Sequence, residues 1–240
     1  MADRLRCMVR KYYEAYDERY KTVHAKGFAW AGEEATEIVA ECIRKYAIGR
    51  SQPMLELGCG EGRDAAVLLE RGYRLRATDV SGEAIAYCRN HYPAFRDSFQ
   101  VLDCVSSEDP CRYDFIYAIA VVHMLLLDED RKAFYRFVRE HLTDQGVALI
   151  AAMGDGETEI TTDVRDAFRL LERNHPSGKM LVAGTSLRMV SFPKFESELA
   201  ESGLQICEKG FTSREPDFDS LMYAVALRDV LPKGRHEARK

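Results

Sequence analysis

The stretch MLELGCGEGRDAAVLL (residues 54–69) constrains the fold of this chain more than any other part of its sequence. A short apolar run that contains one acid, Glu56, leads directly into three alternating glycines, Gly58, Gly60 and Gly62, and then into a helical pattern. Glycines at this spacing let a chain turn sharply between a strand and a helix and bring backbone N–H groups close to a ligand. The stretch therefore predicts a strand, a tight ligand-binding turn and a helix, as in an α/β fold.

Apolar runs and helical patterns continue to alternate after this stretch. Strands are predicted at 54–57, 74–79, 98–103, 115–122 and 147–153, with helices at 63–71, 82–91 and 129–142 between them. After a helix at 193–203, the runs at 204–213 and 220–229 are too close in sequence for a crossover helix, so we expect them to pair antiparallel. The predicted fold class is α/β, a doubly wound Rossmann-like seven-stranded sheet with five parallel strands, a C-terminal antiparallel hairpin and helices on both faces.

The composition narrows the classes of function. A net charge of −5 over 240 residues gives no overall attraction to nucleic acid or anionic lipid. The seven cysteines are scattered and form no CxxC pair, which predicts neither a disulfide framework nor a metal site. The first residues carry charges throughout and lack a signal-peptide core, and no apolar run approaches the ~20 residues that cross a bilayer. We expect a cytoplasmic protein with no nucleic-acid or membrane partner.

Three acids are placed where an α/β fold binds its ligand. Glu56 precedes the first glycine by two residues, Asp79 ends the second predicted strand, and Asp103 closes the third. A carboxylate beside a pyrophosphate would repel it, and the glycines also depart from the GxGxxG spacing of dinucleotide sites, so a nicotinamide oxidoreductase is disfavoured. Carboxylates without a basic phosphate clamp instead indicate a nucleoside that carries a positive charge and no phosphates.

The motifs LELGCGEGRDA, ATDVS, QVLDCVS and YDFIYAIAVVHML resemble the successive motifs of class I S-adenosylmethionine-dependent methyltransferases. The resemblance covers about residues 50–153 and the final hairpin, and it is greatest for the branch that contains tellurite-resistance and thiopurine-type methyltransferases and many small-molecule enzymes. It implies S-adenosylmethionine as cofactor and transfer of a methyl group by in-line displacement to a thiol or chalcogen, amine or oxygen nucleophile of a small molecule. A protein methyltransferase and a non-catalytic S-adenosylmethionine-binding protein remain the alternatives.

The resemblance also implies which residues hold the cofactor. Gly58 and Gly60 would pack against its methionine portion, Asp79 would bind the ribose hydroxyls, and Asp103 with Cys104 would flank the adenine. Two aromatic residues of the N-terminal helical region complete the predicted set, because an N-terminal helix commonly covers the cofactor in this family. The full set is Glu56, Gly58, Cys59, Gly60, Arg63, Asp79, Val80, Asp103, Cys104, Ile119, Tyr20 and Trp30.

Residues that would act on the acceptor are harder to identify, because methyl transfer from a sulfonium requires positioning and exclusion of water more than a dedicated acid or base. His123 follows the fourth predicted strand at the ligand-binding edge and is the catalytic candidate, with a packing role as the competing interpretation. Arg188 is a candidate for contact with an anionic substrate, with a surface salt bridge as its alternative. The sequence does not identify the acceptor, and the oligomeric state stays open.

The chain is expected to form one methyltransferase domain with four parts. Residues 1–50 are predicted to be an N-terminal helical lid, and residues 51–153 the cofactor-binding core. Residues 154–192 are predicted to be an inserted substrate cap, which would contain a helix at 163–174 and a strand at 184–192. Residues 193–240 complete the domain with a helix and the terminal hairpin.

Overall fold

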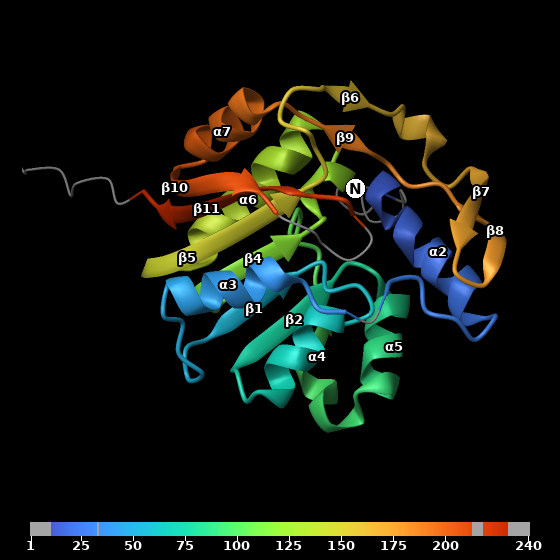
Figure 1. Cartoon of the computed structure of the whole chain (residues 1–240), viewed down its shortest axis with the longest axis horizontal. Helices are drawn as coiled ribbons and strands as arrows, with labels where there is room; N and C mark the ends of the chain where they lie inside the picture. The colour runs from blue at the N-terminus through green and yellow to red at the C-terminus, as the bar shows by residue number, and fades with distance from the viewer. Residues whose placement is uncertain (1–10, 33, 213–217, 230–240) are drawn as a thin grey trace, which may run out of the picture.

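The computed structural model describes residues 11–32, 34–212 and 218–229, and its centre is a seven-stranded sheet (Figure 1). The strands lie in the order β10-β11-β5-β4-β1-β2-β3. Their bounds are β1 Met54–Leu57, β2 Leu75–Asp79, β3 Phe99–Val101, β4 Tyr113–Ile119, β5 Leu142–Ala152, β10 Leu204–Phe211 and β11 Met222–Arg228. Strands β1 to β5 pair in parallel, whereas β11 is antiparallel to both β5 and β10. The predicted fold class is confirmed.

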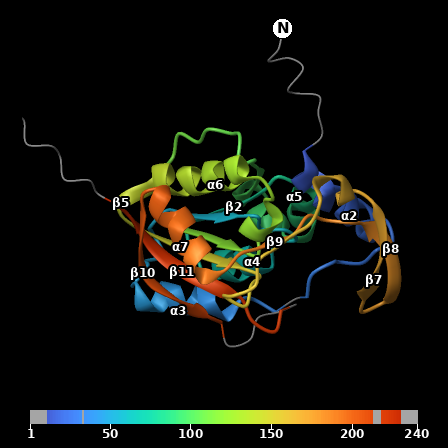
Figure 2. The same ribbon diagram turned by 90° about the horizontal axis from the view of Figure 1, so that it is seen from above.

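Helices cover both faces of the sheet, and Figure 2 shows α3 and α6 on opposite sides of it. Their bounds are α2 Ala15–His24, α3 Glu37–Lys45, α4 Arg63–Glu70, α5 Gly82–His91, α6 Asp128–His141 and α7 Phe192–Glu201. Short 3-10 segments lie at Tyr12–Glu14, Pro93–Ser98, Val122–Met124 and Val164–Asp166. In the part of the chain that the structure describes, no helix is both long and apolar enough to span a bilayer.

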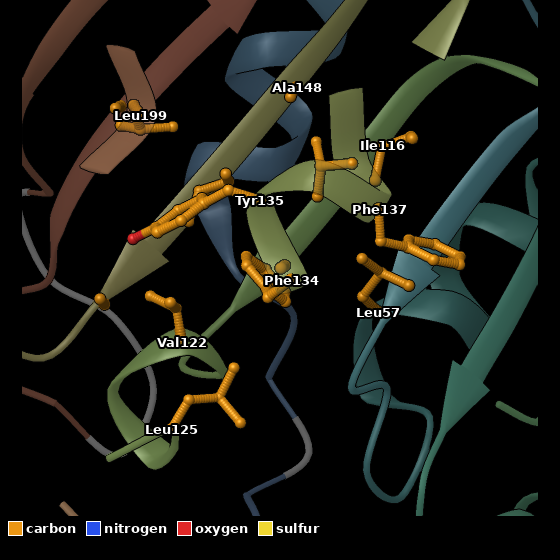
Figure 3. Close-up of a cluster of buried hydrophobic side chains, with 14 of the residues drawn as sticks. Leu57, Ile116, Val122, Leu125, Phe134, Tyr135, Phe137, Ala148 and Leu199 are labelled. Atoms are coloured by element: carbon orange, nitrogen blue, oxygen red, sulfur yellow. The ribbon is translucent and has the colours of Figure 1, made fainter. Parts of the chain in front are cut away.

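The core is divided by the sheet into two buried clusters. One joins α6 and α7 to the sheet, and Figure 3 shows Phe134 and Phe137 of α6 with Leu57 and Ile116 of the central strands. The apolar side of α6 follows the helical spacing that its sequence predicts, because Phe134, Phe137 and Val138 are all buried. The other cluster joins α3, α4 and α5 to the opposite face of the sheet. Burial of each large apolar side chain stabilises the fold by about 1.5–3 kcal/mol, so both layers hold the strand ends in register.

The helix predicted at 163–174 is wrong. Residues after a single 3-10 turn form strand β7 (Leu170–His175), which pairs antiparallel with β8 (Gly178–Ala183). The tight turn between them contains Pro176 and ends at Gly178, whose φ of +116° favours glycine. The predicted strand at 184–192 is reduced to β9 (Arg188–Met189), which pairs with β6 (Ile160–Thr161). The inserted segment is therefore built of β-structure, and Figure 1 shows β7 and β8 beside α2.

Candidate active site

A cavity of about 670 Å³ lies at the carboxyl ends of β1, β2 and β4. The helix α2, the segment that follows it and the turn of the β7–β8 hairpin complete its wall. This volume is in the range of pockets that bind small molecules and cofactors. Every residue that the sequence predicts for the cofactor site lines this cavity, including Tyr20 and Trp30 of the N-terminal region. Their contact with a cofactor stays a prediction.

The glycine turn fits against the end of β4 without space for a side chain. Gly58 has a φ of +74°, and a Cβ atom built on it would lie 2.3 Å from Cγ2 of Val121. Val121 reaches this position because β4 ends at Ile119 and Ala120 adopts a φ of +58°. The prediction that the fourth strand continues to residue 122 is therefore wrong at its end. The early bend directs residues 119–121 into the wall of the cavity.

Asp79 fixes the glycine turn to the end of β2. Its Oδ2 accepts a hydrogen bond from the Gly60 N–H at 2.9 Å, and its Oδ1 accepts one from the Ser81 N–H at 2.8 Å. Burial raises the pKa of the Asp79 carboxyl, although these two backbone hydrogen bonds act in the opposite direction. Because each carboxylate oxygen has two acceptor sites, Asp79 holds the turn and keeps the capacity to accept hydroxyl groups from the cavity.

Glu56 is a buried acid on the cavity wall. The Tyr117 hydroxyl donates to its Oε2 at 3.0 Å. Burial, followed by the nearby charge of Asp64, raises the pKa of Glu56 well above its ordinary value. An ionised carboxylate in this position is poorly solvated, so it favours a cationic group in the cavity.

Two further acids of the same motif hold the segment between α2 and α3 across the cavity. The carboxylate of Glu61 accepts hydrogen bonds from the backbone N–H groups of Trp30 and Ala31, each at 2.7 Å, and contacts His24 Nε2 at 2.8 Å. Asp64 accepts from the N–H and the hydroxyl of Thr36 at 2.6 and 2.7 Å. Sequence analysis missed both roles, and the acids that interrupt the motif GEGRD were the available signal.

Asp103 lines the cavity but already has a cationic partner. Its carboxylate forms an ion pair with Lys11 and accepts hydrogen bonds from the Val105 N–H at 2.9 Å and the Tyr13 hydroxyl at 3.2 Å. Burial alone would raise its pKa, but the hydrogen bonds from Lys11 and Ser106 outweigh burial and hold the pKa below its ordinary value. Asp103 is thus ionised and fixed at neutral pH, and its contact with adenine stays a prediction.

The catalytic candidate from the sequence, His123, is not among the residues that line the cavity. It lies in the 3-10 turn after β4, and its buried Nδ1 accepts a hydrogen bond from the Met153 N–H at 3.3 Å. Burial, with the charge of Arg131 added, lowers the pKa of His123 to about 4. A neutral, weakly basic imidazole in this place supports the turn, and a role in catalysis stays a prediction that this geometry disfavours.

Arg19 of α2 lines the cavity, whereas Arg188 does not. Arg188 is used in the structure, because it donates to the Leu126 carbonyl and forms an ion pair with Asp128 at 2.8 Å. Its alternative reading as a salt bridge is therefore confirmed. Arg19 was missed because the sequence alone does not distinguish a buried arginine on the N-terminal helix from a solvent-exposed one.

Comparison with known proteins agrees with this geometry. Residues 55–148 match a family model described as "Methyltransferase domain". Over 93 residues the chain is 34% identical to Hemagglutinin 1 of Eikenella corrodens, a match that covers 37% of this chain and only 27% of the relative. The chain thus matches about a quarter of the length of this curated relative.

Solved methyltransferase structures share the fold at low identity. The CcbJ methyltransferase from Streptomyces caelestis superposes with a TM-score of 0.63 at 18% identity, over 91% of this chain and 98% of that one. The glycopeptide N-methyltransferase MtfA in complex with S-adenosylmethionine gives a TM-score of 0.60 at 21% identity, over 83% of this chain and 97% of that one. Both similarities concern the fold, and the family match covers residues 55–148, less than half of the chain. This segment is therefore similar to a methyltransferase domain, and the chain shares its fold with solved methyltransferases.

Proposed function

We propose that this protein transfers the methyl group of S-adenosylmethionine to a small-molecule acceptor by in-line displacement. The observation that carries the proposal is the presence of Glu56, Asp79 and the glycine turn on one wall of a cavity of about 670 Å³. In this arrangement Glu56 pairs with the ammonium group of the cofactor and Asp79 accepts from its ribose hydroxyls. Arg63 lines the same cavity, which supports a pairing of its guanidinium with the carboxylate of the methionine portion.

The bound cofactor supplies a methyl group on a cationic sulfur, whose departure as a neutral thioether drives the transfer. The chain's own contribution is to hold the two reactants about 3–3.5 Å apart and to exclude water. Glu61 binds the backbone of Trp30 and Ala31, and Asp64 binds that of Thr36. The Tyr20 hydroxyl packs against the backbone of Gly60. This closure, together with the hairpin, favours a small acceptor over a protein side chain.

Other parts of the proposal follow from the same features. A location in the cytoplasm is consistent with Cys42, Cys59, Cys88, Cys104, Cys111 and Cys207, the described cysteines, all of which are free thiols. A place in the tellurite-resistance and thiopurine-type branch, and the division into lid, core, cap and terminal hairpin, are further parts of this proposal. Residues 1–10 of the lid and 230–240 of the terminal segment lie outside the described residues.

Calorimetry with three ligands tests the cofactor and the enzyme class. We expect S-adenosylmethionine and its demethylated product to bind and NAD to give no heat, because the carboxylates of the cavity repel a pyrophosphate. Binding of NAD alone would overturn the proposal. A screen of thiols, amines and phenols, read by formation of the product nucleoside, then tests transfer. Tight cofactor binding without any turnover across the screen would favour the non-catalytic alternative.

Asp79→Asn is expected to weaken the binding of S-adenosylmethionine by about 10–100-fold, the effect of 1–3 kcal/mol from an impaired polar contact. The asparagine side chain has one acceptor oxygen, so it can accept from only one of the Gly60 and Ser81 N–H groups. Its NH2 group then faces the second backbone N–H group or the ribose. The dissociation constant measured by calorimetry checks this result. Asp109→Asn is the matched control, because Asp109 is equally buried, at 9% exposure, but pairs with Arg76 instead of lining the cavity. It should lower stability and leave the dissociation constant unchanged.

A further inference from the structure

Arg19 is a buried cation that is held in place by the inserted hairpin. Its side chain extends from α2 to β8, where Nε and Nη2 donate to the Ala183 carbonyl at 3.2 and 2.9 Å. Nη2 also donates to the Thr185 hydroxyl at 3.2 Å. The residue is only 4% exposed, yet it lines the large cavity. The hydrogen bonds to the hairpin therefore hold the guanidinium in place on the cavity wall.

The partners of this guanidinium are all neutral. Besides the carbonyl and the hydroxyl, the rings of Tyr16 and Trp30 lie 4.7 and 4.6 Å from its Cζ atom. Within residues 11–32, 34–212 and 218–229, no carboxylate forms an ion pair with Arg19, whereas the other deeply buried arginine, Arg131, pairs with Glu198 at 2.6 Å. A buried charge without a counter-ion is unfavourable by several kcal/mol, so the site favours an anion from the cavity.

The guanidinium lacks an anionic partner among the described residues, although its donors are partly used. Nε and Nη2 donate to the hairpin, and a further side-chain hydrogen bond joins Arg19 to the neutral Tyr16. Among small-molecule anions without phosphorus, a carboxylate suits a planar guanidinium best. The flat rings of Tyr16 and Trp30 pack on the guanidinium, and Phe28, Leu125 and Phe218 line the same cavity together with the polar Asn174 and His175.

We propose that Arg19 binds a carboxylate of the methyl acceptor, which is therefore a small carboxylic acid with a flat, apolar body. This inference rests on the proposed methyl transfer and specifies its substrate class. The carboxylate is the recognition group, because its lone pairs are taken by the guanidinium. The methyl group is accepted by a second heteroatom, whose lone pair forms the new bond while the carbon–sulfur bond breaks. The electron pair of that bond remains on sulfur, and the proton of the acceptor passes to solvent.

The anion could also be the carboxylate of the cofactor itself, and binding measurements separate these two sources. Benzoate and benzamide, which have the same shape and differ in charge, are titrated into the complex with S-adenosylhomocysteine. We expect benzoate to bind at least about 30-fold more tightly than benzamide, as for a charge-assisted contact in a desolvated site. Equal affinities for the two probes would overturn the proposal. Failure of S-adenosylhomocysteine to bind at all would instead overturn the proposed function.

Three variants identify the residue responsible. Arg19→Gln should remove the preference for benzoate and change the affinity for S-adenosylhomocysteine by less than about threefold, whereas Arg19→Lys should retain part of the preference. Arg173→Gln is the matched control. Arg173 is an exposed cation of β7, and burial of Arg19, together with the nearby charge of Arg173, lowers the pKa of Arg19. It should leave the preference intact. A parallel loss of S-adenosylhomocysteine affinity in Arg19→Gln and Arg19→Lys would assign Arg19 to the cofactor and overturn the proposal.

Turnover gives an independent measurement. Aminobenzoates, mercaptobenzoates and hydroxybenzoates are compared with aniline, thiophenol and phenol, and the product is analysed by mass spectrometry. We expect the carboxylated member of a reactive pair to have the higher kcat/KM by at least about 10-fold, with the methyl group on nitrogen, sulfur or the phenolic oxygen. Formation of a methyl ester as the main product, or a higher kcat/KM for the uncharged member, would contradict the assigned role of Arg19.

Discussion

Gly58→Ala is expected to weaken S-adenosylmethionine binding by at least about 100-fold and to lower the free energy of unfolding by about 2–5 kcal/mol. Two effects combine in this change. The backbone at Gly58 has a φ of +74°, which is unfavourable for alanine, and the new Cβ would lie 2.3 Å from Cγ2 of Val121. Relief of that collision moves either the glycine turn or the bend after β4, and both form the cavity wall. Calorimetry and denaturant unfolding measure the two quantities.

Gly72→Ala is a matched control for the backbone strain alone. Gly72 has nearly the same φ, +79°, but a Cβ there would meet no atom within 4 Å. It should lower the free energy of unfolding by about 1–2 kcal/mol and leave cofactor affinity unchanged. The double variant Gly58→Ala, Val121→Ala removes the methyl group that collides, and it should recover part of the lost affinity. Equal losses in Gly58→Ala and Gly72→Ala would show that contact with Val121 is unimportant.

The sheet and the location of the cavity could be predicted because they depend on local pattern. Strand β1 is buried along its whole length, as its apolar run indicates, and the glycines that follow have few conformational alternatives. Once the strands are parallel, their carboxyl ends must share one edge, so Glu56 and Asp79 come together without knowledge of any side-chain contact. The end of β4 was placed incorrectly because Val121 and Val122 continue the apolar run, and only the bend at Ala120 removes them from the strand.

The closure of the cavity could not be predicted for a different physical reason. Glu61 binds backbone N–H groups of Trp30 and Ala31, which every residue except proline has, so the acid itself is visible in the sequence but its partners are not. Arg19 binds a carbonyl 164 positions away in a hairpin whose first strand was predicted as part of a helix. The pattern of Phe168 and Leu171 has helical spacing, but the Pro176–Gly178 turn and pairing with β8 override it. The contacts of Glu61 and Arg19 were missed because they join distant segments, whereas the helix error came from the local turn of the hairpin.

The acids of the cavity consequently divide into two groups with different expected behaviour. Glu61, Asp64 and Asp103 already have two or more hydrogen-bond donors each, so their substitution should first loosen the lid or the N-terminal segment. Glu56 has only the Tyr117 hydroxyl and no cation in hydrogen-bond contact among the described residues. A buried acid in that state destabilises the protein without ligand, which is the pattern expected of a group kept for binding.

Glu56→Gln is therefore expected to change stability and affinity in opposite directions. Because the pKa of Glu56 is raised in the folded protein, the folded state holds its proton more tightly than the unfolded chain does. The contribution of Glu56 to the free energy of unfolding is therefore greatest below its pKa in the unfolded chain, about 4.3. This contribution is lost as the pH rises through the pKa of Glu56 in the folded protein. Glutamine removes this loss, so the variant should be more stable than the parent at neutral pH, by about 1–3 kcal/mol.

The same change should weaken S-adenosylmethionine binding by about 30–1000-fold at neutral pH, because a neutral amide replaces the carboxylate that we propose to pair with the ammonium group. In the parent protein the dissociation constant should decrease as pH rises through the folded pKa of Glu56, while in Glu56→Gln this dependence should disappear. Tyr117→Phe provides the control: loss of the phenol donor raises the folded pKa further, so the affinity should become maximal at a higher pH. If Glu56→Gln lowers stability and affinity together, Glu56 supports the fold and does not bind the cofactor. The protein gains stability on loss of a charge only where that charge is unfavourable in the absence of ligand.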